Sequence, residues 1–212
     1  MMNKKYLTEF FGTAALLSVI TGSGLMGQAL SSGNDALTLL GNSIATGAGL
    51  YVLIMILGPI SEAHFNPLVS VMAYTQKQLK QKDLLPYIAS QITGAILGVW
   101  MTHLMFNLPI LQTSTKIRTG LGIWVSEVIA TLILLSVIYL GLKYAKKNIA
   151  MIVALTVTAG YWFTSSTFFC NPAVTFARSL TDTFVGIAPQ NILGFVIPQV
   201  IALILILQII KK

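Results

Sequence analysis

The stretch "FFCNPAVTFARS", residues 168–179, places Asn171 and Pro172 inside a strongly apolar part of the chain. A near copy, "HFNPLVS", occurs earlier at residues 64–70. Proline is favoured at the first position of a helix, and asparagine at the N-cap position before it. Each stretch therefore predicts the start of a short helix, and the two asparagines lie 105 positions apart (171 − 66).

The composition places these helix starts in a membrane protein. Of the 212 residues, 55% are apolar and 9% are charged, whereas a soluble domain has about 25% charged residues. Six segments run on the order of 20 residues with almost no charge, enough to cross a hydrocarbon core about 30 Å thick. They are residues 8–30, 37–57, 86–106, 120–142, 149–167 and 190–210.

Polar side chains within the third and sixth segments predict helices packed inside a bundle rather than facing lipid. These side chains are Gln91, Thr93, His103 and Gln199. We expect His103 to pack in the interior, and Gly94-x-x-x-Gly98 to permit close contact between helices. The first segment is longer than the apolar region of a signal peptide, so we expect it to remain as a span.

The net charge of +7 is distributed in a way that orients the protein in a membrane and needs no nucleic acid. If the spans alternate in direction, ten of the thirteen basic residues fall on one side. They are Lys4, Lys5, Lys77, Lys80, Lys82, Lys143, Lys146, Lys147, Lys211 and Lys212. This positive-inside pattern predicts a multi-pass protein of the cell membrane with both termini cytoplasmic. The single cysteine, Cys170, excludes an internal disulfide.

The chain repeats one plan in two halves, about residues 6–106 and 120–210. Each half contains a span with a carboxylate (Glu9 in "TEFFGT", Glu127 in "SEVIAT"), a second span, an Asn-Pro segment and a third span. Three spans per half invert the second half relative to the first, as in many transporters and channels. The alternative, chance similarity of two apolar halves, has to explain four features that recur in the same order.

The Asn-Pro segments, residues 66–75 and 171–182, are only about 15–18 Å long as helices and are too short to span. We expect each to enter the membrane as a loop and return as a half-helix, since irregular backbone at that depth must be buried or line a water-filled cavity. Inverted half-helices would meet at the midplane, where their dipoles place partial positive charge. A pore of this kind passes neutral polar molecules and repels cations and protons.

These features resemble the aquaporin, or major intrinsic protein, family over essentially the whole chain. The resemblance is carried by "TEFFGT" at 8–13, "ISEAHFNPLVS" at 60–70, "YIASQITGAILG" at 87–98, "SEVIAT" at 126–131 and "CNPAVT" at 170–175. It implies an all-α membrane fold with six transmembrane helices plus two re-entrant half-helices in an inverted repeat. It also implies a single channel domain over residues 1–212 and a homotetramer with one pore per protomer.

The resemblance also implies roles for individual residues. Asn66 and Asn171 match the paired asparagines that donate to the passing molecule, and backbone carbonyls at about 61–64 and 167–170 would accept from it. Residues that support the half-helices and their loops would be Pro67, Pro172, Glu9 and Glu127. His64 matches a residue that lines the inner vestibule. Cys170 is either a pore-accessible thiol or a small buried apolar residue.

The chain departs from the family in the selectivity filter. Family members generally have an arginine after the second Asn-Pro-Ala, whereas this chain has Val174. Counting without gaps places the other filter positions at Thr46, Ala159 and Phe168. A slip of one or two residues would bring in Gly160 or Phe169 instead. A filter of threonine, alanine, phenylalanine and valine is predicted to be wider and more apolar than a strict water filter.

Three further residues depart from the family or complicate the filter. Arg178 lies one helical turn beyond Val174, so it either reaches back into the outer vestibule or pairs with Asp182 or lipid headgroups. Leu68 replaces an alanine and is expected to pack against the other half-helix. Glu62 replaces a small residue near the cytoplasmic mouth and either pairs with a loop lysine or attracts cations.

We therefore predict a passive channel for water and small uncharged polar solutes, favouring solutes such as glycerol or undissociated arsenite. The alternative is a strict water channel in which Arg178 substitutes for the filter arginine. A secondary active transporter is less favoured, because Glu9 and Glu127 have structural roles. An enzyme is not expected, since no H-E-x-x-H motif or comparable ligand set occurs. We accordingly expect no cofactor, no metal and no nucleic acid, with the lipid bilayer and neutral solutes as partners.

Overall fold

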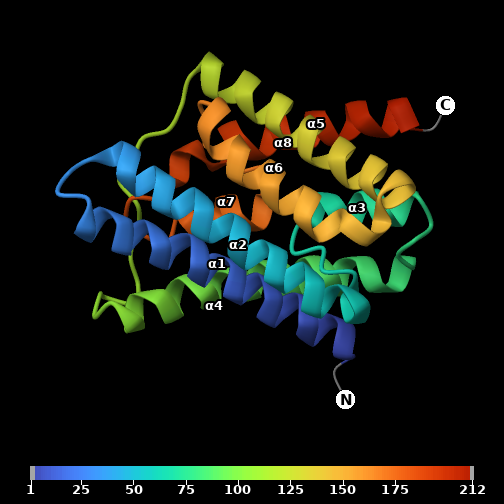
Figure 1. Cartoon of the computed structure of the whole chain (residues 1–212), viewed down its shortest axis with the longest axis horizontal. Helices are drawn as coiled ribbons and strands as arrows, with labels where there is room; N and C mark the ends of the chain where they lie inside the picture. Colours follow the sequence, from blue (N-terminus) through green and yellow to red (C-terminus); the bar gives the residue numbers. More distant parts are fainter. Residues whose placement is uncertain (1–2, 211–212) are drawn as a thin grey trace.

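A computed structural model describes residues 3–210, and these form a helical bundle in which α1 begins and α8 ends at the same end (Figure 1). The long helices are α1 (Lys4–Leu30), α2 (Asp35–Ser61), α4 (Gln81–Met105), α5 (Leu121–Tyr144), α6 (Ile149–Phe163) and α8 (Ile192–Ile210). The short elements are α3 (Pro67–Thr75), α7 (Pro172–Arg178) and the 3₁₀ turns η1 (Lys146–Asn148) and η2 (Pro189–Asn191). The predicted all-α fold with two half-helices is confirmed.

Within residues 3–210, five stretches are long and apolar enough to cross a membrane, namely α1, α2, α4, α5 and Pro189–Ile210. Helix α6 has 15 residues, about 22 Å of rise, because Thr164 adopts extended backbone and turns the chain toward Asn171. The predicted fifth span, residues 149–167, is therefore too long by four residues. Helix α6 nevertheless lies beside α2 and α5 in the bundle.

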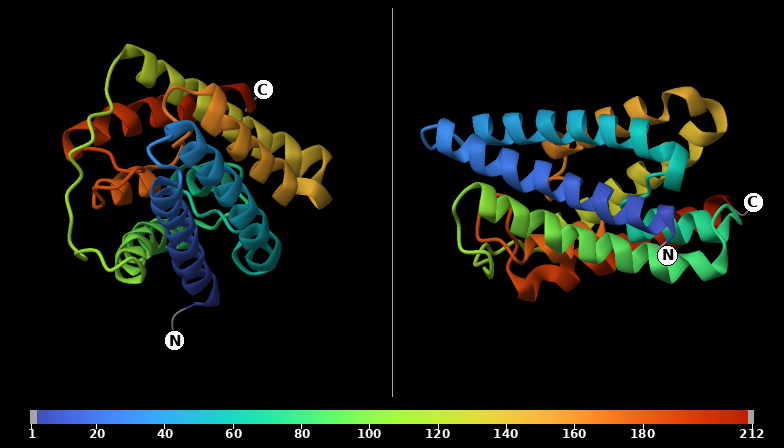
Figure 2. Two further views of the ribbon diagram at one scale, coloured as in Figure 1. Left: turned by 60° about the vertical axis from the view of Figure 1, so that its left-hand side comes forward. Right: turned by 90° about the horizontal axis from the view of Figure 1, so that it is seen from below.

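The packing of the two halves is matched element by element (Figure 2). Helix α1 packs on α2 and α4, as α5 packs on α6 and α8, and α2 meets α6 between the halves. Each half-helix packs against both third spans, α4 and α8. Contacts with α4 and α8 thereby hold α3 and α7 between the two halves of the bundle.

The second half-helix is shorter than the predicted segment, residues 171–182. Helix α7 ends at Arg178 because the carbonyl of Arg178 accepts from the N–H of Ile187, across a chain reversal, rather than from a residue further along a helix. Leu68 also differs from expectation, since it belongs to a buried cluster with Leu135 of α5 and Leu203 of α8. Its side chain therefore packs toward α5 and α8.

The polar residues predicted to face the interior do so with one exception. Gln91, His103 and Gln199 are fully buried, whereas Thr93 is exposed and donates to the carbonyl of Ala89 one turn earlier. His103 contacts the carbonyl of Ile110 and the hydroxyl of Thr181, both at 2.8 Å. This histidine therefore ties the end of α4 to the loops that contain Ile110 and Thr181.

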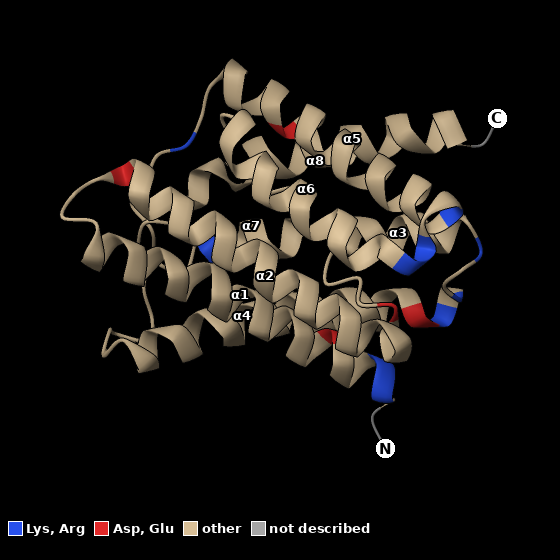
Figure 3. Ribbon diagram, in the orientation of Figure 1, with Lys and Arg blue, Asp and Glu red and all other residues tan. Residues whose placement is uncertain are grey.

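Charged residues gather at the ends of the bundle, with most lysines near the start of α1 and the end of α5 (Figure 3). The middle of the bundle has only a few charged segments (Figure 3), and Glu9, Glu127 and Arg178 are buried. Lys211 and Lys212, part of the predicted positive-inside set, lie outside the described residues.

Candidate functional site

The two asparagines cap the half-helices and join them across the two halves. Asn66 Oδ1 accepts from the N–H of Leu68, and Asn171 Oδ1 accepts from the N–H of Ala173. Asn66 Nδ2 donates to the carbonyl of Cys170 at 2.8 Å, and Asn171 Nδ2 donates to the carbonyl of Phe65 at 2.7 Å. Each amide nitrogen has two hydrogens, so each asparagine retains one donor beyond this reciprocal pair.

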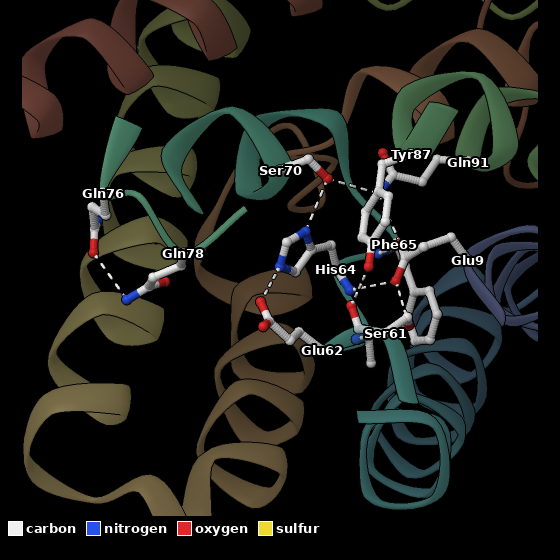
Figure 4. Close-up of polar contacts among 11 residues, drawn as sticks. Glu9, Ser61, Glu62, His64, Phe65, Ser70, Gln76, Gln78, Tyr87 and Gln91 are labelled. Atoms are coloured by element: carbon white, nitrogen blue, oxygen red, sulfur yellow. Dashed lines mark hydrogen bonds and ion pairs between the residues drawn. The ribbon is translucent and has the colours of Figure 1, made fainter. Parts of the chain in front are cut away.

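The loop that leads into each half-helix is held by a buried carboxylate. Glu9 accepts from Ser61 Oγ, Gln91 Nε2 and the N–H groups of His64 and Phe65, at 2.7–3.0 Å (Figure 4). The corresponding group in the second half is Glu127. It accepts from the N–H groups of Phe169 and Cys170 and from Gln199 Nε2.

Both loops use the same unusual backbone conformation. Glu62, Ala63 and Phe65 have φ of 71°, 50° and 47°, and Thr167, Phe168 and Cys170 have φ of 60°, 57° and 48°. These three pairs are separated by the same 105 positions as the asparagines. Left-handed backbone costs on the order of 1–3 kcal/mol for a residue other than glycine and persists where its surroundings fix it. The hydrogen bonds that Glu9 and Glu127 accept from these loops hold the backbone in that conformation.

A cavity of about 600 Å³ runs past the asparagine pair. Its lining includes Glu62, His64, Lys146 and Gln76 at one end and Tyr161, Phe168 and Arg178 at the other. Asn66, Asn171 and Cys170 line the part between. Both asparagines are nearly buried, and the small part of each that is exposed lines this cavity. The cavity is therefore where their remaining donors can bind a solute.

The end of the cavity nearer the lysines carries a short hydrogen-bonded chain (Figure 4). Gln91 Nε2 donates to Ser70 Oγ, which lies 3.0 Å from His64 Nδ1, and His64 Nε2 lies 3.2 Å from a Glu62 oxygen. The bond to His64 lowers the pKa of the Glu62 carboxyl. Glu62 therefore pairs with His64, not with the loop lysine considered above.

Three of the four predicted filter residues line the cavity, and the fourth does not. Thr46, Phe168 and Val174 are buried and face it. Ala159 is exposed on α6 and does not line the cavity, so its prediction as a filter residue is wrong. A helix turns by about 100° per residue, so an error of one or two positions moves a residue to another face. Tyr161, two positions later, lines the cavity and donates to Thr46 Oγ1 at 3.3 Å.

Gly160 provides the space for the Phe168 ring. A Cβ at Gly160 would lie 2.2 Å from an edge atom of that ring. The aromatic wall of the cavity therefore depends on a residue without a side chain. Gly160, the alternative to Ala159 in the sequence alignment, thus supports the aromatic wall of the cavity.

Gly160→Ala should displace the Phe168 ring and narrow the cavity. We expect glycerol flux to fall roughly tenfold, the effect of about 1.4 kcal/mol of added barrier, while water flux falls less. Ala159→Val on the exposed face is the matched control and should leave both fluxes unchanged. Stopped-flow light scattering on proteoliposomes measures both. Equal losses of water and glycerol flux would contradict this role for Gly160.

Arg178 is nearly buried and lines the cavity, which favours the predicted place in the vestibule over the alternative of pairing with Asp182 or lipid headgroups. Its guanidinium centre lies 3.6 Å from the centroid of the Phe169 ring. Asp182 instead accepts from the N–H and hydroxyl of Thr115 at 2.8 and 3.0 Å. The backbone bond from Thr115 lowers the pKa of Asp182.

Neither Tyr161 nor Arg118 was predicted from the sequence as a residue of the site. A tyrosine in an otherwise apolar span was a usable signal for Tyr161, because a buried hydroxyl needs a partner. Arg118 lies in the connection between α4 and α5, and nothing in its local sequence links it to Phe169, 5.8 Å from its guanidinium.

Comparisons with known proteins agree with this architecture. Residues 1–160 match the family described as major intrinsic protein. Aquaglyceroporin AqpS of Rhizobium meliloti is 43% identical over 210 residues, covering 99% of this chain and 90% of AqpS. Aquaporin Z of Brucella melitensis is 36% identical over 95 residues, covering 45% of this chain and 41% of its own length.

Among solved structures, the aquaglyceroporin from Plasmodium falciparum superposes with a TM-score of 0.73. The match covers 95% of this chain and 92% of that one at 19% identity, and so it concerns the fold. Together with the family match and the near full-length relative, it leads to one assignment. This chain is a multi-pass membrane protein that belongs to the major intrinsic protein family.

Proposed function

We propose that this protein is a passive transmembrane channel for water and small uncharged polar solutes. The observation that carries the proposal is the asparagine pair. Asn66 and Asn171 bind each other's loops at 2.7–2.8 Å and line the cavity with donors to spare. Half-helix N-termini at the same point add partial positive charge, which favours neutral solutes that accept hydrogen bonds.

We propose that the relaxed filter of this channel, wider and more apolar than a strict water filter, favours solutes such as glycerol or undissociated arsenite. Val174 contributes an apolar wall where an arginine would project, and Phe168 contributes an aromatic wall. Similarity to a protein named aquaglyceroporin over 99% of the chain supports the glycerol part. Support for arsenite comes only from the filter residues, with Val174 as the main one.

We further propose how the channel is arranged in the membrane. The two repeats, residues 6–106 and 120–210, form one channel domain, and the channel is a homotetramer in the cell membrane. The end of the bundle rich in lysine faces the cytoplasm under the positive-inside rule. Glu62, His64 and Lys146 then line the cytoplasmic mouth, and Arg178 lies toward the outer one.

A strict water channel is the second candidate, and one observation favours it. Arg178 supplies a guanidinium to the outer part of the cavity although residue 174 is a valine. If its side chain fills the filter, glycerol flux will be negligible while water flux is high.

Val174→Arg tests the relaxed filter directly. A long charged side chain at this position narrows the cavity, so we expect glycerol, urea and neutral arsenous acid fluxes to fall roughly tenfold or more. Water flux should fall less. Light-scattering flux measurements in proteoliposomes compare the variant with the unmodified channel. Unchanged ratios of solute to water flux would refute the relaxed filter, and absence of any flux in the unmodified protein would refute the channel.

A further inference from the structure

The outer part of the cavity holds a guanidinium without a carboxylate partner. Arg178 has 2% of its surface exposed. Within residues 3–210, the only acid–base pair within 4 Å joins His64 and Glu62. A buried cation without a counter-ion is costly, and ionisable groups at membrane depth are retained mostly where they act on the permeating species.

The side chain of Arg178 is fixed by contacts that leave its terminal nitrogens free. Its Nε donates to the carbonyl of Val185, and its guanidinium lies over the Phe169 ring. Among the described residues, neither terminal nitrogen has a hydrogen-bond partner, although Arg178 lines the cavity. These nitrogens remain available to molecules in the cavity.

Arg118 also holds the segment that contains Val185. Its Nε donates to the carbonyl of Gly186 at 2.9 Å, and its Nη2 donates to the carbonyl of Phe184 at 3.2 Å. Three consecutive carbonyls, 184 to 186, thus accept alternately from the two arginines. A Cβ on Gly186 would lie 2.4 Å from both Ser114 Oγ and the carbonyl oxygen of Thr181, so this segment is tightly wedged.

We propose that Arg178 excludes cations and protons from the channel, and that Arg118 is the residue that positions it. This inference rests on the proposed channel function. The charge lies one helical turn from Val174, so the channel keeps a fixed positive charge on the permeation path while the filter position itself stays small and apolar. Val174 then sets the size of the solutes that pass, and Arg178 excludes cations.

The test measures cation leak and solute flux in the same proteoliposomes. A trapped pH-sensitive dye reports proton flux under a potassium diffusion potential, and light scattering reports water and glycerol flux. We expect Arg178→Gln to raise proton and methylammonium flux at least roughly tenfold with little loss of water flux. Glutamine retains a donor for the Val185 carbonyl but removes the charge. Arg178→Ala is a second variant with the same expected leak.

A rescue variant separates a charge barrier from a structural role. Adding Val174→Arg to Arg178→Ala places a guanidinium back on the cavity wall and should suppress the leak without restoring the Val185 contact. Arg118→Gln should leak to an intermediate degree. Lys116→Gln removes the same charge from the same loop without contacting the carbonyls at 184 to 186, and it should not leak.

The outcomes distinguish this proposal from the proposed function. Water flux without cation leak in Arg178→Gln would overturn the role of Arg178 and leave the channel proposal standing. Equal leaks in Arg118→Gln and Lys116→Gln would overturn the positioning role of Arg118. No water or glycerol flux in the unmodified protein would overturn the channel itself.

Discussion

Replacing Gly94 and Gly98 together with alanine should lower the unfolding temperature of the channel by on the order of 10 °C. A Cβ at Gly94 would lie 2.2 Å from the carbonyl oxygen of Phe10, and one at Gly98 would lie 2.2 Å from that of Ala14. Both obstacles are backbone atoms of α1, so no side-chain rotation relieves them. Overpacking costs about 1–3 kcal/mol per site, a large share of a typical stability of about 5–15 kcal/mol.

The damage should extend to the pore because α1 and α4 both hold the first loop. Glu9 on α1 accepts from Gln91 on α4 at 2.8 Å, and Ser18 Oγ on α1 donates to the carbonyl of Gly98. Separation of the helices lengthens both bonds and loosens the loop that ends in Asn66. We therefore expect solute flux per folded channel to fall as well.

Gly41→Ala is the matched control for this prediction. Gly41 also lies within a long helix, but a Cβ there meets no atom within 4 Å, so alanine should be neutral or slightly stabilising. Thermal unfolding in detergent compares the variants. If the double variant unfolds at the same temperature as Gly41→Ala, close packing of α1 on α4 is not what stabilises the first half.

The parts of the site that were predictable have local or repeated signals. Asn66 and Asn171 are followed by prolines, and asparagine at the N-cap with proline at the first helical position predicts a helix start wherever it lies. The two copies also supported each other in the sequence, and the structure shows the same spacing of 105 residues between the left-handed backbone positions of the two loops. The half-helices therefore followed from short stretches of sequence.

The parts that were not predictable depend on contacts between distant segments. The direction of the Arg178 side chain follows from the carbonyl of Val185 and the ring of Phe169, which only the folded chain brings together. Ala159 failed because its register on α6 was counted from Asn171 across a loop whose length and conformation the sequence does not fix. Leu68 likewise packs on α5 and α8 through the tertiary fold.

Glu9→Gln should be the most destabilising single substitution of a pore-supporting residue. All four donors to Glu9 are fixed, two on each carboxylate oxygen, and a carboxylate is the only side chain of this length that accepts at both positions. Glutamine would turn one oxygen into an NH₂ group facing two donors. A buried donor left without an acceptor costs about 1–3 kcal/mol, so we expect a loss of roughly 2–6 kcal/mol.

The same substitution should also damage permeation, because the loop that Glu9 holds contains three residues with left-handed backbone, Glu62, Ala63 and Phe65. Without the carboxylate, nothing on the α1 side opposes their relaxation toward ordinary backbone, and the Phe65 carbonyl that receives Asn171 Nδ2 moves. Glu62→Gln is the matched control, since that carboxylate lies in the same loop but its side chain is 53% exposed; its effect on stability should stay below about 1 kcal/mol. Unfolding temperature and water flux measured on both variants decide the matter, and equal behaviour of the two would show that Glu9 does not organise the pore.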